Sequence, residues 1–554
     1  MYFISKKKFD YWNKKGIPYL KPSPILGNYG KYILQQKYYG QVVQEMCWRF
    51  PGQPYFGAYY GTEPVLIVQS PEILKDVLTK DFYYFNGREI SNYTEKEVVT
   101  RNIFFSGGDK WKIVRQNLTP LFSSAKMKNM FYLLEKCGHD FEVMLGRVTS
   151  ASEIIEVREL SAKFTMDCIC SCAFGIEANT MKQDDNNPFL FMAREIFRAS
   201  YYRGFKLVIR SIWPSLFYGF GFKNFPPTID TFFSQLLKGV FQSRDYKPSP
   251  RNDFVDLVLN LRKEDTLIGD SINNSKTGRD DKVYLKVDDE LLVSQCVQFF
   301  GAGFETSANT MGFTLYEFAK NQEVQRRAIE EMDEYLRRHD NQLTYESVNE
   351  LPFLEACVYE TLRAYPVLGV LTREVMDDYT FSTGLRVDKG VRVHIPVYHM
   401  HHNPEYFPDP KKYDPERFLP ENKSNLKPYT YFPYGEGPRI CIGEANTRSF
   451  VFMLVKYRWV MFFYYFCDCH STYSSLSKPR AYLQERIMQI IIHYYHIHVN
   501  ISTSLNACEL YGNALIVINA KYHDKFFLKC TNLKTDPFTI FLSFQVNGLR
   551  RCKS

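Results

Sequence analysis

A long apolar stretch in the middle of the chain predicts a buried helix. From Leu291 to Ser307, apolar residues fall on nearly every side of a helical wheel, and the pattern continues to about Lys320. The acidic residues Asp288 to Glu290 stand at its start, where carboxylates interact favourably with the helix dipole. A helix that is apolar all round belongs in the core. The stretch therefore predicts one long helix inside the protein.

Two glycines and an acid–alcohol pair interrupt this helix, although they are poor choices for a helix interior. One explanation is local: the Thr306 hydroxyl can bond the carbonyl of Ala302, one turn earlier. The other is functional. Ala302 and Gly303 would leave a small groove on the helix beside the Glu305–Thr306 pair. Taken alone, the motif favours the local explanation.

Two shorter helices carry charged residues at helical spacing. One is expected over residues 353–365, ending before a proline, and it places Glu360 and Arg363 on one face. The other places Trp111 and Arg115 on one face at a spacing of four. Each motif taken by itself is common on ordinary surface helices.

A glycine-rich loop at residues 432–443 contains a cysteine. Its sequence is Phe-Pro-Tyr-Gly-Glu-Gly-Pro-Arg-Ile-Cys-Ile-Gly, so Arg439 precedes Cys441 by two residues. A thiolate needs a positive, hydrogen-bonding environment, and glycines let backbone N–H groups approach a sulfur closely. A buried, unreactive cysteine beside a turn is the commoner explanation for such a loop taken alone.

Composition favours one large domain. The chain has 554 residues, yet no linker or repeat divides it before residue 443. The polar segment 263–282 is expected to form an exposed loop. Thirteen cysteines without a secretory signal predict reduced thiols, not a disulfide framework. The net charge of +8 is modest.

The order and separation of these motifs resemble those of the cytochrome P-450 monooxygenases. The resemblance runs from about Asp10 to about Gly443 and is nearest to the microsomal insect and mammalian drug-metabolising branch. It implies a mainly α fold with small β-sheets, the cytochrome P-450 fold, in a single large haem-enclosing domain.

The resemblance gives each motif a role. It implies haem b with the Cys441 thiolate as the axial ligand of the iron, and it makes Glu305 and Thr306 the catalytic proton relay. Glu360, Arg363 and Arg417 match a buried structural cluster. The residues implied in cofactor binding are Trp111, Arg115, Ala302, Arg373 and Arg439, of which Trp111 and the three arginines face the haem propionates.

The implied reaction inserts one oxygen atom of O2 into a lipophilic small molecule. Electrons would come from an NADPH-dependent reductase, with a b-type cytochrome as a further candidate donor, and no nucleic acid is involved. A basic patch for an acidic partner is expected at Lys110, Lys112, Lys126 and Lys128, unless these are simply solvated lysines. The expected pocket residues are Phe299, Phe300, Ala302, Phe304, Val367, Leu368 and Leu371.

The N-terminal segment, residues 1–28, departs from that branch. Only five residues precede the lysines at 6–8, whereas a spanning helix needs about 20 apolar residues. The segment is therefore expected to lack the family's membrane anchor, and no spanning helix is expected elsewhere. Location at the cytosolic face of the endoplasmic reticulum membrane is implied by resemblance. The aromatic stretch 212–222 would then contact the membrane surface or pack in the core.

The C-terminal part departs as well. The haem-thiolate monooxygenase domain is expected over 29–456, followed by an anomalous insertion of unknown structure at 457–529, where neither helical nor strand periodicity is visible. Residues 530–554 are expected to form a closing β region of the domain.

Two other functions remain open at this level. One is a haem-binding but inactive relative that cannot accept electrons, with the altered C-terminal part as the cause. The other is a thiolate-haem isomerase or dehydratase that rearranges peroxides without a reductase. The intact Glu305–Thr306 pair argues against the second, because such enzymes need no proton relay.

Overall fold

A computed structural model describes most of the chain, in the ranges 8–151, 155–182, 187–198, 200–251, 253–443, 529–530 and 542–543. The expectations for residues 1–7, for 457–528 and for most of 530–554 lie outside the described residues. Two short strands in the C-terminal part of the chain are among the described residues. These are β9 (Lys529–Cys530) and β10 (Leu542–Ser543), which pair antiparallel.

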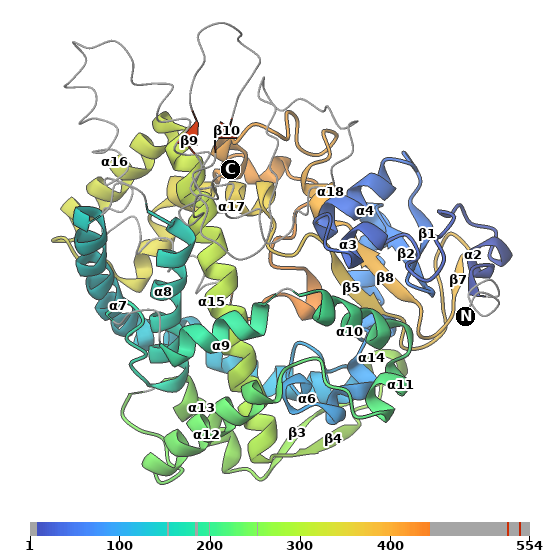
Figure 1. The fold of residues 1–554 in the computed structure, drawn as a ribbon, viewed down its shortest axis with the longest axis horizontal. Coiled ribbons are helices and arrows are strands. Elements are labelled where there is room, and N and C mark those ends of the chain that lie inside the picture. Colours follow the sequence, from blue (N-terminus) through green and yellow to red (C-terminus); the bar gives the residue numbers. More distant parts are fainter. Residues whose placement is uncertain are drawn as a thin grey trace, which may run out of the picture.

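The expected long helix is α15 (Asp289–Lys320), which runs through the helical part of the molecule (Figure 1). It begins where the side chain of Asp288 accepts a hydrogen bond from the backbone N–H of Leu291, at 2.7 Å. This cap satisfies one of the donors left open at a helix start. The sequence thus predicted the helix and its first turn correctly.

Helices surround α15. The helix expected over 353–365 is α17 (Pro352–Ala364), with a proline at its first position. The other helices of this part are α6 (Gly108–Leu118), α7 (Ser124–Ala151), α8 (Val157–Ile169), α9 (Pro188–Phe197), α10 (Tyr201–Ile212), α11 (Pro214–Gly219), α12 (Pro227–Ser243), α13 (Phe254–Arg262) and α16 (Gln322–Arg338).

A small mixed sheet with its own core lies beside the helical part (Figure 1). Its order is β1-β2-β8-β5, and β2 and β8 run parallel while the other pairs are antiparallel. The strands are β1 (Tyr55–Tyr60), β2 (Glu63–Val68), β5 (Leu371–Glu374) and β8 (Arg392–Ile395). The short pair β6 (Tyr379–Thr380) and β7 (Arg386–Val387) and the helices α2 (Tyr11–Lys14), α3 (Gly30–Ile33), α4 (Tyr39–Cys47), α5 (Pro71–Lys75) and α18 (Val397–His401) complete this part.

The polar segment 263–282 is more ordered than the sequence suggested. It contains β3 (Thr266–Asp270) and α14 (Asn274–Thr277), and β3 pairs with β4 (Lys282–Lys286) as a hairpin against α6. The expectation of an exposed loop was therefore wrong for this segment, because packing against α6 gives it regular structure. A side chain at Gly269 would lie 2.9 Å from Ile113, so the glycine permits a close approach to α6.

Within the ranges that the model describes, none of the helices is both long enough and apolar enough to cross a membrane.

Four buried or half-buried histidines make stability depend on pH. Burial lowers the pKa of His394 to about 3 and those of His399 and His402 to about 4, and it holds the pKa of His401 well below its usual value. Because all four values lie below the unfolded value of about 6.5, the unfolded chain binds more protons than the folded one in mild acid. Stability is therefore complete above pH 6.5 and is lost as pH falls.

We expect each buried imidazole to cost roughly 1.4 kcal/mol per pH unit below about 6.5. Urea unfolding at pH 7.5, 6.5 and 5.5 measures this loss, and His394→Gln should reduce its slope by about one proton. His139, whose side chain is 74% exposed, provides the control His139→Gln. A stability that stays constant down to pH 5.5 would contradict the prediction.

Candidate functional site

The cysteine loop is a tight backbone turn that presents Cys441 at the protein surface. The backbone N–H of Gly435 donates to the carbonyl oxygen of Phe432 at 3.0 Å, and that of Cys441 donates to the carbonyl oxygen of Tyr434 at 2.9 Å. Gly435 and Gly437 have φ of +82° and +73°, the left-handed region where a side chain is strained. Gly437 also lies so close to the backbone of Leu78 that a Cβ would clash. The glycines are thus required by the shape of the loop.

Arginines from separate elements gather beside this loop. Arg439 is the last residue of the turn Gly437–Arg439, is 8% exposed, and stacks on Trp111 of α6 at 4.6 Å. Its guanidinium donates to the carbonyl oxygens of Ser106 and Phe104. Arg373 of β5 is 2% exposed. The sequence analysis had named both arginines, and the fold brings them together.

Electrostatics show that these cations lie close to one another. Burial lowers the pKa of Arg373 to about 10, and burial followed by repulsion from Arg373 lowers that of Arg88 to about 9. For Arg439 the pKa falls well below its usual range, first through burial and then through Arg88, Arg373 and Arg115. Burial lowers the pKa of Arg115, while the nearby Cys441 opposes that shift.

This cluster fits an anionic cofactor edge. In the described part of the chain, Arg88, Arg115, Arg373 and Arg439 form no ion pair with a carboxylate, although a buried charge is normally paired. The Nε atoms of Arg88, Arg373 and Arg439 are buried without a hydrogen-bond partner. Two carboxylates of a bound group would supply both the missing charge and the missing acceptors, as the propionates of haem do.

Arg88 is the member that the sequence analysis missed. It lies in the loop between α5 and α6, with its guanidinium 3.7 Å from the ring centroid of Phe104. No helical spacing or local motif connects Arg88 to the other three arginines. Its role becomes visible only when the fold brings the separate segments together.

On α15, the structure supports the local explanation for Thr306 and changes the role of Gly303. The Thr306 hydroxyl donates to the carbonyl of Ala302 at 2.5 Å. A Cβ on Gly303 would meet Ile169 of α8 at 2.5 Å, so this glycine serves helix packing and does not form the expected groove. Ala302 is exposed, and Glu305 forms an ion pair with Arg158 of α8 at 2.6 Å.

Three of the residues expected to line a substrate pocket, Phe299, Phe300 and Phe304, pack against the core. Phe299 packs against Phe122 and Phe254, with ring centroids 4.9 and 4.5 Å apart. Phe300 is fully buried and Phe304 is 3% exposed. An apolar run could not reveal which helix face is open, whereas Leu368, 48% exposed, keeps an accessible side chain.

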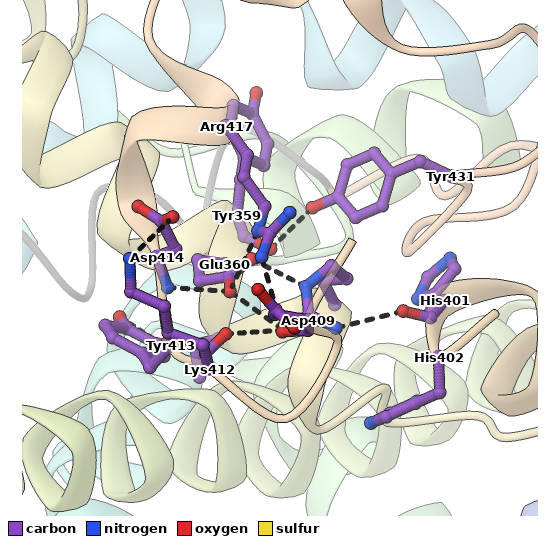
Figure 2. Close-up of polar contacts among 12 residues, drawn as sticks. Tyr359, Glu360, His401, His402, Asp409, Lys412, Tyr413, Asp414, Arg417 and Tyr431 are labelled. Carbon is purple, nitrogen blue, oxygen red and sulfur yellow. Dashed lines mark hydrogen bonds and ion pairs between the residues drawn. The ribbon is translucent and has the colours of Figure 1, made fainter. Parts of the chain in front are cut away.

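The predicted Glu-Arg-Arg cluster is present, with Glu360 and Arg417 labelled in Figure 2. Arg363 binds Glu360 through two bonds, of 2.7 and 2.8 Å, and both side chains are completely buried. Arg417 approaches the same carboxylate at 3.8 Å. Burial raises the pKa of Glu360, and Arg363 opposes that shift. The N–H of Asp414 donates to Glu360 at 2.9 Å, which ties the chain before the cysteine loop to α17.

His401 extends this cluster to the loop itself. Arg363 donates to the carbonyl of His401 at 3.0 Å, and Nε2 of His401 accepts the N–H of Phe432 at 3.1 Å. The buried ion pair and the first residue of the cysteine loop are therefore joined through one residue.

Comparison with known proteins gives one consistent result. A family model described as "Cytochrome P450" matches residues 17–498. The chain is 34% identical to "Cytochrome P450 6j1" of Blattella germanica, over 80% of this chain and 85% of that protein. It is 35% identical to "Cytochrome P450 6k1" of the same species, over 82% and 86%. It is 32% identical to "Cytochrome P450 6B2" of Helicoverpa armigera, over 81% and 86%.

Arg363→Met should destabilise the protein strongly. The substitution would leave Glu360 buried without its bidentate partner, which typically costs about 3–5 kcal/mol. Chemical denaturation measures the loss, and Arg326→Met, which removes exposed ion pairs on α16, is the control. Equal denaturation midpoints for the two variants would contradict a supporting role for the buried cluster.

Proposed function

The chain belongs to the cytochrome P450 family, and on that premise we propose that the Cys441 loop and the adjoining arginine cluster bind its haem. The observation that carries this proposal is a set of four buried or half-buried arginines, Arg88, Arg115, Arg373 and Arg439, without a carboxylate partner among the described residues. Such an arrangement is costly unless an anion occupies the space between them.

Family membership establishes the reaction class. The protein is a haem-dependent monooxygenase, an oxidoreductase that inserts one oxygen atom of O2 into a lipophilic small molecule. An NADPH-dependent reductase supplies the electrons. The cofactor is haem b with a cysteine thiolate as axial ligand, and when bound it supplies the activation of oxygen.

Cys441 is the thiolate that fits this role. Among the cysteines between residues 8 and 443 it is the exposed one, whereas the others are buried or half-buried. Arg115 interacts electrostatically with its sulfur, and a neighbouring cation favours the thiolate over the thiol. The glycine turns hold the sulfur outside the packed core, where a metal can reach it.

Trp111, Arg115, Arg373 and Arg439 would hold the propionates, and Arg88 adds a further cation. Ala302 and Thr306 lie one turn apart on the same face of α15, where the small side chain of Ala302 would leave room for oxygen. Thr306 would then pass protons inward and Glu305 would receive them from solvent, as the acid and alcohol of a relay.

The insect relatives indicate association with the endoplasmic reticulum membrane. We place the protein at its cytosolic face, with the 212–222 stretch as the contact. One residue of that stretch packs in the core and others face solvent. Phe217 is 2% exposed, whereas Leu216, Phe220 and Phe222 are 53, 75 and 50% exposed. Exposed aromatic rings suit a membrane interface.

The basic patch expected for the reductase is partly neutralised. Lys110 pairs with Glu95 and Lys128 pairs with Glu346, while Lys112 donates to the carbonyl of Ser271 at 2.9 Å. These contacts reduce the charge available to an acidic partner.

Cys441→Ala should abolish the thiolate Soret band after reduction under carbon monoxide, because the axial sulfur is lost. Cys172→Ala, at a half-buried cysteine, is the matched control and should retain the band. A normal band from Cys441→Ala would refute the assignment.

Arg88→Gln should have opposite effects on the haem-free and haem-loaded protein. Without haem, it removes a buried cation that repels Arg373 and Arg439, so the denaturation midpoint should rise. With haem, it removes a partner of the propionates, so haem transfer to apomyoglobin should be about tenfold faster, as for one lost charged hydrogen bond.

Arg88→Lys keeps the charge and should resemble the wild type in both assays. The same direction of change with and without haem would contradict the prediction.

A further inference from the structure

The hairpin of β3 and β4 is hydrogen-bonded to one side of α6 (Figure 1). The Asp109 carboxylate accepts the N–H of Ile272 at 2.5 Å and the hydroxyl of Ser271 at 3.1 Å. The side chain of Gln116 accepts the N–H of Asp270 at 3.1 Å and donates to its carboxylate at 2.9 Å. Hydrogen bonds thus join the hairpin to α6 near both ends of the helix.

Between these hydrogen bonds the two elements approach closely at Gly269 of β3. A Cβ at this position would lie 2.9 Å from Cγ1 and 3.2 Å from Cα of Ile113. Ile113 is 2% exposed, and Leu267 of the same strand is 4% exposed, and both belong to one buried apolar cluster. The hairpin is therefore packed against α6 as well as bonded to it.

The hairpin and the arginine cluster occupy different sides of α6. The residues that contact the hairpin follow the i, i+3, i+4, i+7 spacing of a single helical face and are 109, 112, 113 and 116. Trp111 and Arg115 lie on the other side, where Trp111 stacks on Arg439 and Arg115 lies near Cys441. Because a short helix moves as one unit, contacts on the first face fix the direction of the second.

The hairpin also reaches the segments that carry two other arginines of the cluster. Lys276, in α14 between the two strands, lies 5.2 Å from the ring centroid of Tyr83 and pairs with Asp377 at 3.0 Å. Tyr83 stands five residues before Arg88, and Asp377 stands four residues after Arg373. The hairpin therefore connects α6 to the two segments whose arginines lie beside it.

We propose that the β3–β4 hairpin is a clamp that keeps Trp111 and Arg115 directed at the haem propionates, with Asp109 as its positioning residue. The proposal rests on the proposed function, because it assumes that the arginine cluster holds the cofactor. Arg115 and Arg439 repel each other, so α6 gains energy by moving away from the cluster. The hairpin contacts oppose this movement, and haem then meets a site that is already arranged.

The rate at which the holoenzyme releases haem to apomyoglobin measures the clamp. Asp109→Ala removes both hydrogen bonds that the carboxylate accepts, and Gly269→Ala places a methyl group against Ile113. Each variant should release haem about tenfold faster than the wild type, as expected for the loss of a hydrogen bond to a charged group. Asp109→Asn keeps a carbonyl oxygen as acceptor and should stay within about twofold of the wild type.

Two control variants separate the clamp from a general loss of stability. Ile268→Thr changes a β3 side chain that is 58% exposed, on the outer face of the same hairpin. Val43→Ala removes packing from a buried cluster that contains no residue of α6, so it lowers the denaturation midpoint without touching the clamp. Both controls should release haem at the wild-type rate.

Hydrogen exchange of the holoenzyme gives a second measurement that is independent of activity. The backbone amides of α6 should exchange faster in Asp109→Ala than in the wild type, whereas those of α17 should not change, because the substitution frees one helix and leaves the rest of the fold intact. Uniformly faster exchange in both helices would contradict a local clamp.

Arg373→Gln separates failure of the clamp from failure of the haem site. If this variant releases haem faster than the wild type but Asp109→Ala and Gly269→Ala do not, the clamp is wrong and the haem site stands. If Val43→Ala releases haem as fast as Asp109→Ala at an equal loss of stability, the clamp is also wrong. If Arg373→Gln leaves the release rate unchanged, the assigned haem site is overturned, and the clamp with it.

Discussion

The repulsion among four buried or half-buried arginines is the constraint on which the site depends. Arg88, Arg115, Arg373 and Arg439 come from four separate segments. Burial lowers all four pKa values, and repulsion from neighbouring arginines lowers those of Arg88 and Arg439 further. A protein gains nothing from packing like charges in its interior. On the proposed function, a dianionic cofactor edge between them would make the arrangement favourable, so that folding and haem binding would share one energetic balance.

The scaffold around this cluster contains a second set of buried charges, which differ from the arginines in being paired with each other. Glu360 and Arg363 satisfy each other completely, and their remaining bonds reach His401 and Asp414 in the segments that precede the cysteine loop. His401 accepts the N–H of Phe432, at the start of that loop. The balanced pair thus anchors the loop, and the loop places Cys441 beside the unbalanced cations.

Helix α15 packs against the core on one face and leaves another face open, which explains why an otherwise apolar helix contains glycines and an acid–alcohol pair. Gly303 admits α8, and Phe300 and Phe304 fill the core, so these residues are set by packing. Ala302 and Thr306 lie on another face, and Glu305 sits between the two, bound to Arg158. A helix that must pack closely on one side and stay open on the other cannot be apolar and regular throughout.

The sequence by itself determined the long helix, its acidic start, the Glu360–Arg363 pair and the glycine turns before Cys441, because helical spacing, capping and backbone conformation are local. Through the order of its motifs it also named Arg115, Arg373 and Arg439, three of the four arginines that gather beside the Cys441 loop. Tertiary structure decided which face of α15 is open, made a hairpin from the polar segment 263–282, and brought Arg88 and Arg158 to the site. Those features depend on contacts between segments far apart in the chain, whose packing and electrostatic energies exist only after folding.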